Sequence, residues 1–228
     1  MTANRYGNVL TIILIILILA ILIGVGILGY NIIKKRNQEN RTIVAIEEFD
    51  KVVEENEEEE IEQEEEEDDR DLKVEETERT EEETTSTQTR KKVYHEGFVM
   101  LGYITIPKTN IKYPILDTVS PEAIDTAVAA LYPSSPQLNS PGNVVIIGHN
   151  YRDGRFFSNN KRLSIGDKIK IKDDRGKELT YTIYKVFETT PEDTSFYARN
   201  TNGAIEITLS TCTDDGKLRT IILARVEK

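Results

Sequence analysis

The longest run of hydrophobic positions lies near the N-terminus, where Val9 to Ile33 form 25 nearly uninterrupted apolar positions without a charge. As a helix rising about 1.5 Å per residue, this run can cross a bilayer core of about 30 Å with some tilt. A signal-peptide core is shorter, and no small-residue cleavage pattern follows this run. The pattern therefore predicts an uncleaved single-pass anchor, with residues 1–36 as the anchor segment and about 9–33 in the membrane.

After residue 93 the pattern changes to short apolar or alternating runs, which are typical of strands. Residues 168–172 alternate lysine with isoleucine and predict a strand with one solvent-exposed face. Residues 143–148 form an apolar run and predict a central strand that is buried on both faces. The same reasoning predicts strands at 102–107, 111–116, 179–187, 204–212 and 220–226.

One helix is expected among these strands. Ser120 precedes a proline, which is the combination of cap residue and first-turn proline that begins helices. Ile124, Val128 and Leu131 then recur at helical spacing, and Pro133 ends the predicted helix. Seven or so short strands with one or two helices predict a mainly β fold that closes into a β-barrel, because closure removes exposed strand edges.

A strongly acidic segment separates the anchor from the strands. Residues 47–83 hold 23 acidic and 4 basic side chains, a net charge of −19 in a chain whose total is −11. The segment has few apolar residues, so it buries too little surface to offset its ordering entropy. We therefore expect residues 37–92 to form an acidic stalk, disordered or at most transiently helical, that holds a domain, residues 93–228, away from the membrane surface. A less specific interpretation is that this segment is a solvated spacer without specific partners.

The charge and cysteine content of residues 93–228 narrow the function further. This part of the chain has 16 acidic and 17 basic residues, so it offers no positive field for nucleic acid, and we expect no nucleic-acid partner. The single cysteine, Cys212, rules out an internal disulfide. In an oxidising exterior, such an unpaired thiol is either buried or reactive.

Three chemically useful side chains occur at strand ends. Cys212 ends the run at 204–212, Arg219 opens the final run, and His149 directly follows residues 143–148. A thiol attacks a carbonyl as thiolate, so it needs a proton acceptor or a positive field, which His149 and Arg219 can supply. Whether Arg219 shares a face with Cys212 depends on the strand register. The trio predicts acyl transfer, and the alternative is a core cysteine, a turn histidine and a solvated arginine.

The residues around these side chains also resemble a known family. Residues 208–212, Thr-Leu-Ser-Thr-Cys, resemble the Thr-Leu-x-Thr-Cys signature of sortases, the membrane-anchored cysteine transpeptidases of Gram-positive bacteria. The Gly-His pair at His149 resembles the histidine strand of that family, and Arg219 matches its arginine. The resemblance runs from about Phe98 to Val226, and it implies an eight-stranded sortase-type barrel.

The resemblance implies a specific reaction. Cys212 would attack a Leu-Pro-x-Thr-Gly-like sorting signal of a surface protein, and an amine of a peptidoglycan precursor or a pilin lysine would resolve the thioester. His149 would exchange protons with the amines, Arg219 would stabilise the oxyanion, and Thr211 would help to position the substrate. No cofactor and no metal is expected.

The resemblance also implies a domain on the extracellular face of the cell membrane. Counting charges gives the opposite result, because Lys34, Lys35 and Arg36 follow the span and only Arg5 and the amino terminus precede it. Large domains translocate largely regardless of flanking charge, so we expect an exported domain.

Two other functions stay open from the residues alone. One is a cysteine hydrolase that transfers its acyl group to water. The other is a non-catalytic, membrane-tethered β-barrel that displays a binding face and buries an inert Cys212. The sortase subclass also stays open. No Asp-Pro-aromatic lid motif precedes the first predicted strand, which argues against a pilus-polymerising class.

Overall fold

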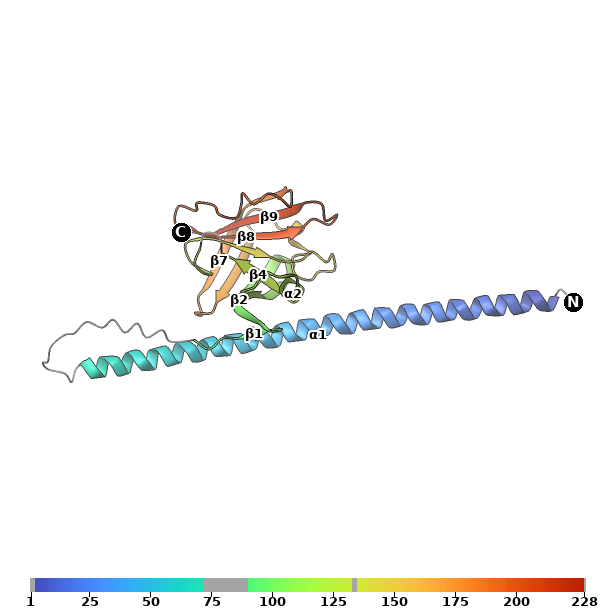
Figure 1. Ribbon diagram of the computed structural model, residues 1–228, viewed down its shortest axis with the longest axis horizontal. Coiled ribbons are helices and arrows are strands. Elements are labelled where there is room, and N and C mark those ends of the chain that lie inside the picture. Colours follow the sequence, from blue (N-terminus) through green and yellow to red (C-terminus); the bar gives the residue numbers. More distant parts are fainter. Residues whose placement is uncertain (1–2, 72–89, 133–134, 228) are drawn as a thin grey trace. The chain divides into compact units, whose positions relative to one another are not determined.

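The computed structural model describes residues 3–71, 90–132 and 135–227. The chain divides into two compact units, Met1–Ile43 and Val44–Lys228. In chain order, the helices, 3₁₀ turns and strands are α1 (Ala3–Asp71), β1 (Tyr94–His95), β2 (Phe98–Ile106), η1 (Pro107–Thr109), β3 (Ile111–Leu116), α2 (Pro121–Ile124), β4 (Val128–Leu131), β5 (Gly142–Ile147), η2 (Asn160–Arg162), β6 (Lys168–Asp173), β7 (Glu178–Thr189), β8 (Ile205–Cys212) and β9 (Arg219–Val226) (Figure 1).

Eight of the strands form a closed barrel. They follow one another in the order β2-β3-β4-β5-β8-β9-β7-β6, and β6 pairs with β2 to complete the circle. The two-residue strand β1 pairs with the outer part of β2. Closure satisfies the backbone donors and acceptors that an open sheet would expose at its edges. The prediction of a mainly β fold with an eight-stranded barrel is confirmed.

Side-chain alternation along the strands builds the core. Ile169 and Ile171 of β6 are fully buried inside the barrel, whereas the lysines at 168 and 170 are exposed, as the sequence predicts. Strand β5 is buried on both faces. Val144 and Ile146 belong to the interior cluster, and Val145 packs in a second cluster on the other side of the sheet. The wall between β4 and β8 is therefore covered from both sides.

The helix predicted to run as far as Pro133 is wrong beyond its first turn. Ser120 caps the helix through its side chain, which accepts a hydrogen bond from the N–H of Ala123, but α2 ends at Ile124. The next apolar run forms β4, which pairs in parallel with β3 and antiparallel with β5. Val128 is fully buried there. Pairing with two neighbouring strands overrides a helical spacing that extends over only two turns.

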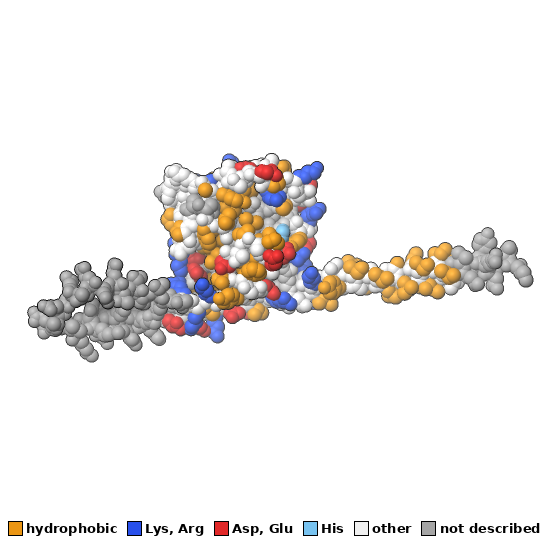
Figure 2. Space-filling model, in the orientation of Figure 1, with side chains coloured by type: hydrophobic (Ala, Val, Ile, Leu, Met, Phe, Trp, Pro, Cys, Tyr) orange, Lys and Arg blue, Asp and Glu red, His pale blue; other side chains and the backbone are white. Residues whose placement is uncertain are grey.

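The N-terminal unit is part of α1. Its described hydrophobic side chains, from Leu10 to Ile33, are exposed around the helix, and Figure 2 shows hydrophobic side chains in orange along it. By length and composition, this helix can cross a membrane. Such exposure is stable in lipid, where apolar side chains need no protein partner. The described structure thus supports the predicted N-terminal anchor helix.

The structure differs from the expected disordered stalk at residues 37–92. Helix α1 continues through Asp71, and residues 72–89 lie outside the described part of the chain. Ala45, Ile46, Phe49 and Val53 are all at least 94% buried. Phe49 follows the adjacent pair Ala45 and Ile46 by three to four residues, and Val53 follows Phe49 by four, so all four lie on one face of the helix. The high acidic content hid this short apolar stripe in the sequence.

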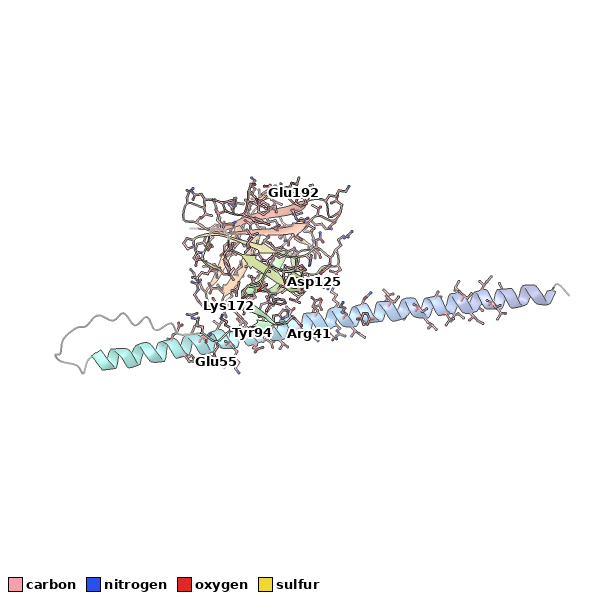
Figure 3. The ribbon with its side chains drawn as sticks, in the orientation of Figure 1. Arg41, Glu55, Tyr94, Asp125, Lys172 and Glu192 are labelled. Atoms are coloured by element: carbon pink, nitrogen blue, oxygen red, sulfur yellow. The ribbon has the colours of Figure 1, made fainter. Side chains whose placement is uncertain are left out.

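The apolar stripe packs on the outside of the barrel. The Phe49 ring lies edge-on to the ring of Tyr103 of β2, with 6.0 Å between their centroids. Beside it, Lys172 Nζ of β6 lies 2.7 Å from Asp50 Oδ1, and the Tyr103 hydroxyl donates to the same carboxylate at 3.2 Å. Figure 3 labels Lys172 on this side of the barrel. The conformational entropy lost when this part of α1 becomes ordered is offset by the burial of its apolar face.

Candidate active site

Cys212 and Arg219 lie opposite each other at one end of the β8–β9 ladder. They are Cα partners in this antiparallel pair, and their side chains are both partly exposed. Directly opposed residues of an antiparallel pair project to the same face, with Cβ atoms about 4.5–5.5 Å apart. The register that the sequence left open therefore places the thiol and the guanidinium side by side on one face of the sheet.

His149 lies just beyond the end of β5, the other strand that pairs with β8. The parallel register pairs Ile147 with Ser210, and the N–H of Gly148 donates to the Ser210 carbonyl at 3.2 Å. The Asn150 side chain then donates to the carbonyl of Cys212 at 2.9 Å. His149 lies between these two contacts, so it is level with Cys212. Adjacent strands are about 4.8 Å apart.

The main chain around His149 is tightly packed. Its carbonyl accepts a hydrogen bond from the N–H of Phe157 at 3.0 Å, and the Phe157 ring is fully buried. A Cβ atom at Gly148 would lie 2.8 Å from Phe157 and 2.9 Å from Val128. Only glycine fits at this position without moving its neighbours. The glycine before the histidine is thus explained by close packing.

A carboxylate and an aromatic ring hold the imidazole of His149. The Nε2 atom lies 3.1 Å from Oδ1 of Asp125, the residue that follows α2. The hydroxyl of Tyr151 donates to the same oxygen at 2.5 Å, and its ring lies 4.9 Å from the imidazole. Burial and the bond to Asp125 raise the pKa of Tyr151 to about 12, so this hydroxyl keeps its proton at neutral pH.

Hydrogen bonds from Asn150 and Lys161 to Asp214 link the loop after His149 to the loop after Cys212. Asn150 also donates to Asp214 Oδ1 at 3.0 Å, and Lys161 Nζ lies 2.5 Å from the other oxygen of that carboxylate. The bonds from Lys161 and Asn150 lower the pKa of Asp214. Asp214 is therefore ionised at neutral pH. These bonds connect the loop after His149 to the loop after Cys212.

A cavity of about 160 Å³ opens beside the thiol. Its lining residues are Asn150, Phe157, Lys161, Glu188, Thr211, Cys212, Thr213, Asp214 and Thr220. Thr211 is 4% exposed, and its hydroxyl has no hydrogen-bond partner among the described residues. Successive strand residues point to opposite faces, so the side chains of Thr211 and Cys212 lie on opposite faces of β8.

The structure places Cys212 and Arg219 opposite each other on β8 and β9, and it places His149 just beyond the end of the adjacent strand β5. Thr211 precedes Cys212 on β8. Sequence reasoning missed Asp125 and Asn150, although Asn150 directly follows His149 in the chain. No local signal marks Asp125, because only folding brings α2 beside the end of β5. Figure 3 shows Asp125 at the rim of the barrel.

Comparisons with known proteins assign the family. The sortase domain model matches residues 104–227, more than half of the chain. The chain belongs to the sortase family. Sortases are cysteine transpeptidases, and this chemistry agrees with a thiol, an imidazole and a guanidinium at the neighbouring ends of β8, β5 and β9. No curated protein matches this sortase.

Solved sortase structures share the barrel. The chain is 27% identical to a Clostridium perfringens sortase D5 transpeptidase, with a TM-score of 0.51 over 57% of this chain and 79% of that one. It is 26% identical to a lid mutant of sortase A from Corynebacterium diphtheriae, with a TM-score of 0.51 over 57% and 70%. It is also 26% identical to a pilus-related sortase C of Group B Streptococcus, with a TM-score of 0.52 over 57% and 68%. These neighbours belong to three sortase classes, so the subclass of this sortase stays unresolved.

Proposed function

We propose that this sortase cleaves a Leu-Pro-x-Thr-Gly-like sorting signal and joins the released acyl group to an amine of the cell wall or of a pilin. The observation that carries the proposal is the strand register. It gives Cys212 and Arg219 a shared face, and it brings His149 level with the thiol. Family membership supports the same reaction class. Residues 1–36 would anchor the enzyme, with residues 93–228 as the catalytic domain outside the cell.

Acylation needs each member of the trio. The Cys212 thiolate forms a bond to the carbonyl carbon of the Thr–Gly peptide, and the negative charge moves to the carbonyl oxygen. Arg219 stabilises this oxyanion with its fixed charge and its forked donors. The C–N bond then breaks, and protonated His149 gives its proton to the leaving amine. The product is a thioester on Cys212.

Deacylation reverses these roles with a different amine. The acceptor nitrogen attacks the thioester carbon, neutral His149 takes a proton from it, and the C–S bond breaks to restore the thiolate. The Thr211 hydroxyl would help to hold the substrate beside the thiol. If water replaced the amine, the same steps would make the enzyme a hydrolase.

The test is mass spectrometry of the full-length protein in detergent, incubated with a small library of five-residue sorting peptides. We expect a thioester adduct on Cys212 with one motif and a ligated product when an amine is added. Cys212→Ala should remove both products while the melting temperature is unchanged. Turnover retained by Cys212→Ala would contradict the proposal, and a hydrolysed product that amines do not divert would identify a hydrolase.

A non-catalytic binding barrel makes a different prediction about the thiol. An inert Cys212 would react slowly with a thiol reagent at neutral pH, and replacing His149 by alanine would leave that rate unchanged. The proposed enzyme requires a rate that depends on His149. Because Cys212 is the single cysteine, the labelling rate reports on this site alone.

A further inference from the structure

One nitrogen of the His149 imidazole, Nε2, lies close to the carboxylate of Asp125. Asp125 Oδ1 lies 3.1 Å from Nε2, within hydrogen-bond distance. A carboxylate only accepts hydrogen bonds, so a proton on Nε2 would complete this contact, whereas a bare nitrogen would repel the carboxylate. With the proton on Nε2, Nδ1 is the nitrogen of neutral His149 that can accept one. The contact thus favours one tautomer as well as one orientation of the ring.

The Asp125 carboxylate is itself fixed in place. The Tyr151 hydroxyl donates to the same Oδ1 atom, and the Tyr151 ring packs 5.7 Å from the ring of Phe156, which is fully buried. The main-chain N–H of Asp125 closes the short helix α2 by donating to the Pro121 carbonyl at 3.1 Å. Two separate contacts, one to the side chain and one to the main chain, thus hold Asp125 beside His149.

Solvent limits how much this pair can contribute. The Asp125 side chain is 61% exposed and that of His149 is 32% exposed, so water screens their attraction. A buried Asp in a catalytic triad has effects of several orders of magnitude, but an exposed one should have much smaller effects. The fixed geometry through Tyr151 matters more here than the charge alone, because it removes ring orientations that cannot exchange protons with the substrate.

We propose that Asp125 is a positioning residue for His149, supported by Tyr151, which keeps the imidazole proton on Nε2 and directs Nδ1 to proton exchange. This inference rests on the proposed function, since it assumes that His149 exchanges protons during acyl transfer. When His149 becomes an imidazolium, the carboxylate also stabilises its positive charge. Asp125 itself touches neither the thiol nor the substrate in this scheme.

The test compares Asp125→Asn, Tyr151→Phe and the control Glu122→Gln in the full-length protein. Glu122 lies on the same short helix and is exposed, so its replacement changes charge without changing the pair. For thioester formation with a sorting peptide, Asp125→Asn should lower kcat about tenfold and leave KM within about twofold. Tyr151→Phe should lower kcat about threefold, and Glu122→Gln should match the wild type.

A second measurement reports on positioning directly. The chain has two histidines, so ¹⁵N-histidine labelling gives few signals, and His149→Ala assigns them. In the wild type at neutral pH, the neutral His149 ring should carry its proton on Nε2. Asp125→Asn should shift part of the population to the Nδ1–H tautomer, which a merely structural role would not do. If Asp125→Asn fails to fold, Tyr151→Phe carries the same test.

Each outcome distinguishes the inference from the proposed function. If Cys212→Ala retains turnover, the proposed function fails, and the positioning role fails with it. If Cys212→Ala is inactive but Asp125→Asn keeps the wild-type kcat and tautomer, the positioning role alone is wrong. A rise in kcat in Asp125→Asn would also overturn it, because the pair would then hold the imidazole in an unproductive orientation.

Discussion

The two halves of the candidate active site are held by different kinds of interaction. Cys212 and Arg219 lie on β8 and β9, whose backbone hydrogen bonds continue along both strands. His149 lies beyond the last residue of β5, where a loop carries it and side chains such as Asp125 and Asn150 hold that loop in place. Backbone pairing survives most substitutions, whereas each side-chain contact can be removed by one.

Because of this difference, substitutions in the two halves should test different properties of the site. A substitution at Arg219 leaves the β8–β9 ladder intact, so its effect should report the chemical role of the guanidinium. A substitution around His149 should instead alter where the imidazole lies. Substitutions in the strand half should therefore lower activity without lowering stability. Substitutions in the loop half should lower activity by smaller, graded amounts.

The largest effect in this comparison should come from Arg219→Lys. Lysine keeps the positive charge but lacks the planar fork that holds an oxyanion through two donors. We expect kcat for peptide cleavage to fall about 100-fold, with little change in the melting temperature. Arg225→Lys, on the exposed part of the same strand, is the matched control and should keep full activity. More than half of the wild-type kcat in Arg219→Lys would remove the oxyanion role.

An intermediate effect is expected from Gly148→Ala. The added methyl group would contact Phe157 at 2.8 Å and Val128 at 2.9 Å, so the loop after β5 must shift. Overpacking of this kind costs about 1–3 kcal/mol of unfolding free energy. We expect the melting temperature to fall and kcat to drop about tenfold, because the shift moves His149 relative to the thiol.

A double variant tests the cause of that loss. Val128→Ala removes one of the two crowded neighbours, so the loss of unfolding free energy in Gly148→Ala/Val128→Ala should be smaller than the sum of the two single losses. Additive losses, or an unchanged melting temperature in Gly148→Ala, would mean that the packing before His149 does not hold the loop.

The sequence predicts the strand half of the site better than the loop half. The alternation in β6, the buried run of β5 and the positions of Cys212 and Arg219 at strand ends are local patterns. The face shared by Cys212 and Arg219 needs the register, which the chain sets only when the barrel closes. The carboxylate beside His149 comes from residue 125, after a short helix, and no periodicity marks it.

Two segments depart from their local sequence preference for the same physical reason. The spacing of Ile124, Val128 and Leu131 fits a helix, but the run becomes β4 because β3 and β5 both pair with it. The acidic segment fits a disordered stalk, but Phe49 and its neighbours on α1 find apolar partners on the barrel. In both segments tertiary contacts outweigh a local preference.

A smaller effect than that of Gly148→Ala should come from Asn150→Ala. This side chain donates to the Cys212 carbonyl and to Asp214, and it links the two loops that meet beside the thiol. Its hydrogen bonds are partly solvated, so we expect kcat to fall about fivefold and the free energy of unfolding to fall by about 1 kcal/mol. Cleavage kinetics and denaturant unfolding of the full-length protein measure both.

Asn150→Asp sharpens this last test. Aspartate keeps an acceptor for the N–H of Arg152, which Asn150 Oδ1 binds at 3.1 Å, but it replaces the donor with a second negative charge. Asp214 has a lowered pKa and is ionised at neutral pH, so the two carboxylates would repel each other. Asn150→Asp should therefore be less active than Asn150→Ala, and Lys161→Met should have the mildest effect. Equal activity in all three variants would show that the linked loops do not set the distance between His149 and Cys212.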